Sequence, residues 1–302
     1  MSKSNKKNIN WLVDEFTSID LVPVIKASNI KSSETQTLID EEGKKYNFRS
    51  SVVENDELGR PSKLKNYNQK GELVEEYKYS YVDKVQKIEL YELGKKSCIW
   101  TYEYDAKDQL IKSEYSETAD DSRDIDIYTY DDKGRLTKIL MDIYPQEVED
   151  EEPATGYELE WDGEKLMSVG EFYGEEEEAQ IVFEYDEKGL VSSVKKYIYL
   201  IDDEDEEVEE VIDEQAPKFD DKGRLVENSI IYHSSGSKLV ISYEYKGDTE
   251  TVIRTVHKDY ENAKLVRSVE FLEDENGNLL KSVEQFHQAK ATKTDTFSYI
   301  NK

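Results

Sequence analysis

The chain has 302 residues, of which 36% are hydrophobic and 36% charged, and its formal net charge is −29 at pH 7. A single cysteine excludes both an intrachain disulfide framework and a cysteine-based zinc site. No stretch approaches the roughly 18 apolar residues of a membrane-spanning helix, and the basic segment Met1–Lys7 is not followed by the apolar run of a signal peptide. We therefore expect a cytoplasmic protein without membrane contact.

Residues 1–45 do not follow the pattern of the rest of the chain. Asn10–Phe16 is compatible with a short helix whose N-cap is Asn10. The run Ser28–Thr37 is rich in Ser, Thr and Asn, which is typical of a loop. We predict a short irregular or helical N-terminal cap over residues 1–45, because a repeat array needs its first apolar face covered.

Further along, Ile125–Met141 is the clearest copy of a repeated phrase, and it predicts a β-hairpin. Tyr128–Tyr130 are strand formers, and a second strand follows from Leu136. Asp131 stands where a type I turn favours a side-chain acceptor, and Gly134 where a three-residue loop needs a left-handed residue. Counting outward from this turn predicts three cross-strand pairs: Tyr130 with Leu136, Thr129 with Thr137, and Ile127 with Ile139.

The same phrase returns along the chain, and each interval between copies holds two strands and a return loop. Asp108 replaces the turn glycine in one copy, where aspartate is a tolerated substitute. Self-similarity at this period predicts an all-β array of tandem antiparallel hairpins over residues 46–302, in a single continuous domain of stacked neighbours. The turn acids are Asp105, Asp131, Asp162, Asp186 and Asp220, followed by turns at 246–248 and 274–277.

The phrase Tyr-x-Tyr-Asp-x-x-Gly-Arg-Leu resembles the YD repeat of the RHS family over roughly residues 45–285. It is closest at Tyr128–Leu136, Phe183–Leu190 and Phe219–Leu225. Members of that family build long spiralling strips of β-hairpins, which in large toxins close into shells around a cargo. This chain has only about seven to nine units and no toxin segment after a shell-closing motif. The resemblance therefore implies a curved, open, elongated sheet with exposed faces.

Negative charge is concentrated in residues 142–215, which contain 28 Asp and Glu against 4 Lys. The densest runs are 147–152, 175–178 and 202–210, and we expect them in the return loops of successive repeats. Stacking would then place these runs, which we call the acid belt, on one edge of the sheet. Direct binding of nucleic acid is disfavoured, because phosphates would be repelled.

Two interpretations of the acid belt are about equally supported. Acidic loops can keep an edge-rich β protein soluble, or they can bind a basic protein partner with fast, salt-sensitive association. Under the second interpretation, carboxylates supply the charge and three tyrosines anchor the partner. These residues are Glu149, Asp150, Glu151, Glu152, Glu175, Glu176, Glu177, Glu178, Asp202, Asp203, Glu204, Asp205, Glu206, Glu207, Tyr173, Tyr197 and Tyr199.

Signals for catalysis or metal binding are weak. His233, His257 and His287 lack a second ligand at helical or strand spacing and are expected in exposed loops. Cys98 lies in a strand pattern and is expected to be a small buried hydrophobe. The acidic runs lack the spacing of an EF-hand loop, and no carboxylate pair is singled out as that of a glycosidase. We predict no enzyme, no metal site and no cofactor.

The main functional hypothesis is an immunity or inhibitor protein that neutralises a basic partner, such as a nuclease toxin, through the acid belt. An alternative is a surface or extracellular RHS-type module that binds carbohydrate or protein through a tyrosine-rich sheet face, since the chain has 22 tyrosines. A third reading is a truncated piece of a larger shell. All three hypotheses rest on a fold-level analogy.

Overall fold

The computed structural model describes residues 30–119, 122–141, 155–174, 176–201, 207–274, 276 and 278–301. Regular structure in these ranges consists of twenty β-strands, and none of it is a helix long and apolar enough to cross a membrane. The strands are β1 (Ile30–Glu41), β2 (Lys44–Asn55), β3 (Pro61–Tyr67), β4 (Leu73–Val82), β5 (Val85–Glu92), β6 (Lys95–Tyr104), β7 (Leu110–Glu117), β8 (Arg123–Tyr130), β9 (Leu136–Met141), β10 (Thr155–Asp162), β11 (Lys165–Tyr173), β12 (Glu176–Tyr185), β13 (Val191–Ile201), β14 (Glu207–Phe219), β15 (Leu225–Tyr232), β16 (Ser237–Tyr245), β17 (Val252–Glu261), β18 (Lys264–Glu273), β19 (Leu279–Phe286) and β20 (Ala291–Asn301).

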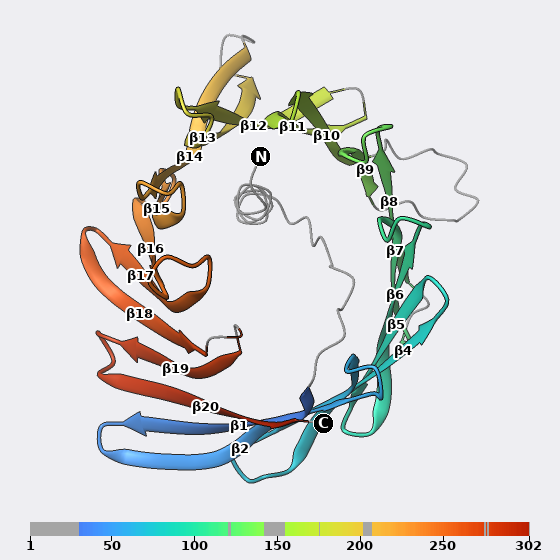
Figure 1. The fold of residues 1–302 in the computed structure, drawn as a ribbon, viewed down its shortest axis with the longest axis vertical. Helices are drawn as coiled ribbons and strands as arrows, with labels where there is room; N and C mark the ends of the chain where they lie inside the picture. The colour runs from blue at the N-terminus through green and yellow to red at the C-terminus, as the bar shows by residue number, and fades with distance from the viewer. Residues whose placement is uncertain are drawn as a thin grey trace. The chain divides into compact units, whose positions relative to one another are not determined.

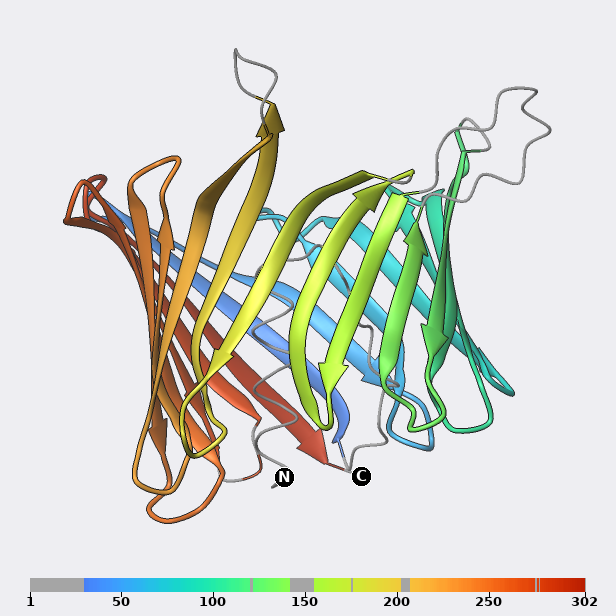
Figure 2. The ribbon, with the colours of Figure 1, turned by 90° about the horizontal axis from the view of Figure 1, so that it is seen from above.

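The chain divides into two compact units. Unit 1 comprises Met1–Asp20 and Tyr157–Thr292, and unit 2 comprises Leu21–Gly156 and Lys293–Lys302. Within each unit, strands that follow one another in sequence pair in antiparallel fashion, for example β4 with β5 in unit 2 and β12 with β13 in unit 1. The yellow strands of unit 1 in Figure 2 accordingly alternate in direction.

The predicted open, elongated sheet is wrong, because the strand pairing is closed. All twenty strands belong to one sheet, and β1 pairs with β20 as well as with β2, so these three strands lie side by side in unit 2 (Figure 1). Thr37 of β1, which is almost fully buried, donates a hydrogen bond to Asp295 of β20. Unpaired strand edges invite association with other chains. Pairing the first strand with the last removes those edges.

The sheet also begins inside the segment predicted as an N-terminal cap. β1 starts at Ile30, so most of the predicted loop Ser28–Thr37 is strand, and the predicted boundary at residue 45 falls inside β2. The predicted helix at Asn10–Phe16 lies outside the described residues. The strand character of β1 comes from its ten-residue register with β2, which supplies backbone partners that a local reading of Ser and Thr does not anticipate.

The turn chemistry predicted for Asp131 is confirmed, and seven described hairpins use it. In each, the side-chain oxygen of the first turn residue accepts hydrogen bonds from the backbone N–H groups two and four residues later. Gly134 has φ +78°, and Asp108 takes the same left-handed region with φ +62°. Asp162 is an exception, because β10 and β11 are joined by the two residues Gly163 and Glu164. The seven residues are Asp56, Asn68, Asp105, Asp131, Asp186, Asp220 and Asp274.

The predicted register is right at the turn and wrong beyond it. Tyr130 pairs with Leu136 as predicted, but a β-bulge follows between Thr129 and Tyr130. Thr129 therefore pairs with Lys138, and Ile127 with Leu140. An extra residue on one strand increases its local twist, and a one-residue shift moves every later side chain to the other face. A bulge at this place accompanies all seven turns.

In four hairpins, a tyrosine at or next to the end of the strand before the turn connects that turn to an earlier one. Its hydroxyl donates a hydrogen bond to a backbone carbonyl 19 or 20 residues before it in the sequence. Buried polar groups need such partners, and these bonds lock neighbouring turns together in both units. The pairs are Tyr81 with Pro61, Tyr130 with Leu110, Tyr185 with Leu166, and Tyr245 with Leu225.

The most buried side chains of unit 1 line one face of its strands. Phe183 pairs with Val194, and Val194 pairs with Gln215, which in turn pairs with Ile230. All four are nearly inaccessible to solvent. Because side chains alternate between faces, the opposite face of the same strands carries the polar residues. This alternation positions the site described next.

Candidate functional site

The strands β10–β14 of unit 1 carry the highest density of negative charge in the described part of the chain. Between residues 155 and 219, the described residues include 16 Asp and Glu against 5 Lys. The local alternation is clear in β12, where Ala179, Ile181 and Phe183 are buried while Glu184 is exposed. Strand periodicity therefore directs the carboxylates to solvent.

Three glutamates of this surface form a group that we call the carboxylate cluster: Glu158, Glu160 and Glu177. Glu158 and Glu160 are exposed residues two apart on β10, so they share a face. Glu177, near the start of β12, is close enough for both charges to act on it. The pKa of Glu177 is raised above its ordinary value. The largest cause is partial loss of solvation, and the charges of Glu160 and Glu158 add to it. The cluster is therefore a concentration of mutually repelling charge.

Gly170 and a β-bulge allow the cluster to form. A Cβ atom at Gly170 would lie 2.4 Å from Oε1 of Glu177, so a side chain there would displace this carboxylate from its position over β11. The register of β11 with β12 shifts between Glu171 and Phe172, which leaves Glu178 without a directly opposed partner. A bulge re-aims the side chains next to it. The backbone thus presents Glu177 and Glu178 at the edge of the paired region.

Compensation of this charge is partial. Ser168 donates a hydrogen bond to Glu160 at 2.9 Å, which satisfies one oxygen without neutralising it. Beside the cluster, Nζ of Lys196 lies 3.4 Å from Oε2 of Glu171. Burial raises the pKa of Asp213, and the charge of Lys196 opposes this shift. Lysine therefore balances part of the surface around Glu171 and Asp213, while the hydrogen bond that Glu160 accepts comes from the neutral hydroxyl of Ser168.

The structure places only some of the residues predicted for partner binding. Glu176, Glu177 and Glu178 are exposed at the start of β12, and the backbone of Glu207 begins β14, so these acids lie in strands and the predicted return-loop location is wrong for them. Tyr173 is 46% exposed and pairs with Glu176 across β11 and β12. The other acids lie outside the described residues: Glu149, Asp150, Glu151, Glu152, Glu175, Asp202, Asp203, Glu204, Asp205 and Glu206.

Tyr197 and Tyr199 lie in β13, where both are half-buried. Tyr197 pairs with Gln180 of β12, and Tyr199 pairs with Glu209 of β14. Glu158 and Glu160 were not predicted as binding residues, because they do not belong to a run of consecutive acids. The alternating order Glu158, Leu159, Glu160 is the signal that identifies them, since it predicts two carboxylates on one strand face above a buried leucine.

The residues considered for chemistry are placed as follows. Cys98 is buried in β6, as predicted. His257 lies within β17 against the ring of Phe271, not in an exposed loop, and burial lowers its pKa. His287 is exposed and lies within hydrogen-bonding distance of Ser268. Within the described ranges, no group of three or more His, Cys, Asp or Glu is arranged to hold a metal ion.

Comparison with known proteins gives no family assignment: no family model matches, and no curated protein matches. Similar solved structures include that of TcdB2-TccC3-Cdc42, at 11% identity and TM-score 0.33, covering 80% of this chain and 15% of that one. The chain thus spans only about 15% of the length of that match. A porin-like protein from Bacteroides uniformis matches at 11% identity and TM-score 0.36, covering 92% and 99% of the two chains. A porin-like protein from Bacteroides vulgatus matches at 11% and TM-score 0.28, covering 90% and 98%.

The predicted cytoplasmic localisation is contradicted together with the open sheet. It was inferred from the absence of a signal-peptide run and of long apolar runs, and the second is a criterion for helical spans. The chain instead forms a closed sheet of strands, to which that criterion does not apply.

Proposed function

We propose that the chain is a non-enzymatic binding protein that holds a basic protein partner on the acidic surface of β10–β14. The carboxylate cluster carries this proposal, because three glutamates held together by strand register repel one another when no partner is present. A lysine- or arginine-rich surface would relieve that repulsion and would be drawn to it over long range. A nuclease is one class of basic protein that such a surface would block.

Rigid strands support the proposal. Paired strands lie about 4.8 Å apart and do not rearrange easily, so the carboxylates keep their spacing without the entropic cost of ordering a loop. Exposed Tyr173 beside Glu176 adds an aromatic group next to the charge, and tyrosine is a common anchor in interfaces. The competing explanation, that the charge only maintains solubility, predicts no dependence on the arrangement of particular glutamates.

The test is a pull-down from native lysate at low and high salt, comparing two variants that remove the same charge. The first replaces the cluster (Glu158→Gln, Glu160→Gln, Glu177→Gln). The control replaces three exposed glutamates elsewhere (Glu41→Gln, Glu92→Gln, Glu250→Gln). We expect the native chain and the control to retain the same basic protein at low salt and to release it at high salt, and the cluster variant to lose it at both.

Retention of that protein by the cluster variant would sink the proposal and leave the charge as a solubility feature. A pH titration of the complex gives a second readout. Binding requires ionised carboxylates, and partial loss of solvation raises the pKa of Glu177 above its ordinary value. Glu177 should therefore become protonated at a higher pH than an ordinary glutamate, and the affinity for the partner should begin to fall at that higher pH as the solution is acidified. In Glu177→Gln, the affinity should begin to fall only at a lower pH.

A further inference from the structure

Unit 2 contains a cavity of about 100 Å³ between three turns that follow one another along one edge of the sheet. One turn follows Asp56, the next joins β4 to β5, and the third follows Asp105. The cavity therefore lies where turns on this edge of the sheet contact one another. Its polar lining comprises Arg60, Asp83, Lys84, Gln86, Tyr104 and Asp108.

Two deeply buried groups in the lining have no hydrogen-bond partner. Gln86 is 3% exposed and Tyr104 is 8% exposed, and neither Nε2 of Gln86 nor the hydroxyl of Tyr104 has a partner within the described chain. Buried polar atoms are almost always paired. Burial raises the pKa of Tyr104, so its hydroxyl keeps its proton and remains a donor. Both groups can therefore donate to an acceptor atom in the cavity.

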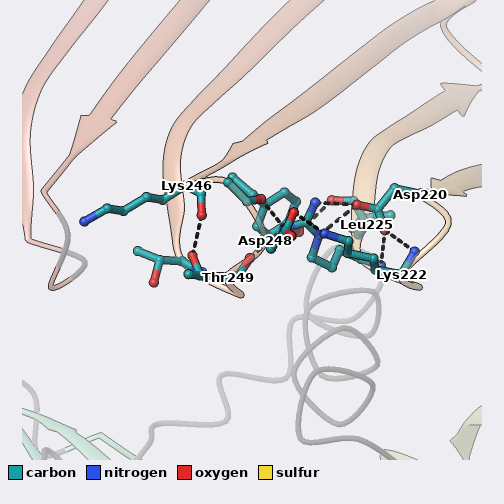
Figure 3. A network of polar contacts seen from close by, with 10 residues as sticks. Asp220, Lys222, Leu225, Lys246, Asp248 and Thr249 are labelled. Atoms are coloured by element: carbon teal, nitrogen blue, oxygen red, sulfur yellow. Dashed lines mark hydrogen bonds and ion pairs between the residues drawn. The ribbon is translucent and has the colours of Figure 1, made fainter.

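The equivalent position in unit 1 shows what such a space can hold. Arg224 lies over the ring of Tyr245 at 4.5 Å, as Arg60 lies over Tyr81 at 4.1 Å. Nη1 of Arg224 also donates to the carbonyl oxygens of Gly247 at 3.0 Å and Thr249 at 2.6 Å. The loop that supplies them is held by Lys222 against Asp248 and by Thr249 against Lys246 (Figure 3).

Arg60 has no such loop beside it. Its Nε and Nη2 are bonded to Asp56 at 2.9 and 2.8 Å. The next turn on the same edge of the sheet, between β4 and β5, contains only Asp83 and Lys84. The described residues show no hydrogen bond from Arg60 to this turn. The cavity in unit 2 thus occupies the place that peptide carbonyl groups fill in unit 1.

The charges around the cavity indicate a neutral ligand. Arg60 is paired with Asp56, and Lys84 with Asp108, so both cations are already compensated. Asp83 remains as a negative group in the lining. An anion would gain no net attraction here. A carbonyl oxygen is a neutral acceptor with two lone pairs, so it can accept hydrogen bonds from Gln86 and Tyr104 at the same time.

We propose that this cavity binds a neutral amide, whose carbonyl oxygen accepts hydrogen bonds from Gln86 and Tyr104. The amide is part of a peptide loop of a partner protein or a small free amide, and both present the same chemistry. The volume supports this class, because a water molecule needs only about 10–15 Å³ on the same measure. The site lies in unit 2 and does not depend on the acidic surface of unit 1.

The full chain, isotopically labelled, should be titrated with N-acetylglycine N-methylamide while the side-chain amide signals of Gln86 are followed by NMR. We expect a saturable shift of these signals and no comparable response to sodium acetate. Tyr104→Phe, which removes one donor and keeps the ring, should weaken binding about tenfold. Gln86→Leu should abolish saturable shifts at the neighbouring backbone of β5. Tyr130→Phe, a tyrosine outside the cavity lining, is the matched control and should bind as the native chain does.

Circular dichroism of each variant separates loss of binding from loss of folding, and Tyr104→Phe remains informative if Gln86→Leu is destabilised. Longer blocked glycine peptides distinguish the two sources: affinity rising with length identifies a peptide loop, and constant affinity identifies a small amide. The proposal is overturned if no saturable shift occurs, which would mean that water alone fills the cavity. Equal responses to acetate and the amide, or native binding by Tyr104→Phe, would also overturn it.

Discussion

At the scale of single residues, the turn acid governs the local geometry. The backbone N–H of Arg135 donates to Asp131, and this bond, together with the Arg135 side chain, lowers the pKa of Asp131. Asp274 has a lowered pKa too, first because the side chain of Asn278 donates to it. Different residues thus solve the same problem, which is to satisfy the N–H groups that a tight turn exposes.

The glycine of this turn gives the first prediction. Gly134 has φ +78°, and a Cβ atom there would approach Nε2 of Gln109 at 3.3 Å. Gly134→Ala should lower the free energy of unfolding by about 1 kcal/mol, because an L-residue is strained in the left-handed region. Gly134→Asn should cost less, since asparagine tolerates this region and Asp108 occupies it in another turn. Urea denaturation measures both, and equal losses would contradict the explanation.

At the scale of elements, contacts between turns organise the two units. Gln109 donates to the carbonyl of Gly134 at 3.0 Å, in the next turn on the same edge of the sheet. Arg224 likewise donates to two carbonyls of the next loop on its own edge. These bonds join one hairpin turn to another, whereas the backbone hydrogen bonds of the sheet join two adjacent strands. The residue that follows the turn glycine is therefore the position through which successive hairpins are attached.

A comparison of two arginines gives the second prediction. The Arg224 side chain is 11% exposed and has carbonyl acceptors beyond Asp220, while Arg60 is 29% exposed and has none in the following turn. Arg224→Lys should therefore cost about 1 kcal/mol more than Arg60→Lys, because lysine cannot reproduce the planar fork and leaves the carbonyls unpaired. Thermal unfolding of the two variants measures the difference. Equal costs would show that the carbonyl contacts contribute little.

At the scale of the whole molecule, the closing pair β1 and β20 gives the third prediction. Deleting residues 291–302 removes β20, one of the two strands that pair with β1, and an exposed strand edge promotes pairing between chains. The shortened chain should therefore self-associate, as measured by size-exclusion chromatography with light scattering. Asp295→Ala is the milder variant, since it keeps β20 and removes the acceptor of Thr37 and the ion-pair partner of Lys293. It should cost about 1 kcal/mol while leaving the chain unassociated. A shortened chain that stays unassociated would show that this edge is protected in another way.

Features set by neighbouring residues were predictable from the sequence. The turn at Asp131, the left-handed Gly134 and the pair of Tyr130 with Leu136 all follow from side chains within six positions of one another. The bulge beyond Tyr130 was not predictable, because it depends on how each strand twists against the next. The alternation of Glu158 and Glu160 was present in the sequence, but their proximity to Glu177 required the register of separate strands.

The sequence by itself determined that this chain forms antiparallel hairpins, since Asp, Gly and the flanking aromatic residues meet the steric and hydrogen-bonding demands of one turn. Only the tertiary structure decided that β1 pairs with β20, that Gly170 makes room for Glu177, and that Gln86 and Tyr104 face an open cavity. The reason is physical. Turn geometry is a local property of a few residues, whereas closure, charge clustering and cavities depend on pairings between distant segments, whose cost in chain entropy is offset only in the complete fold.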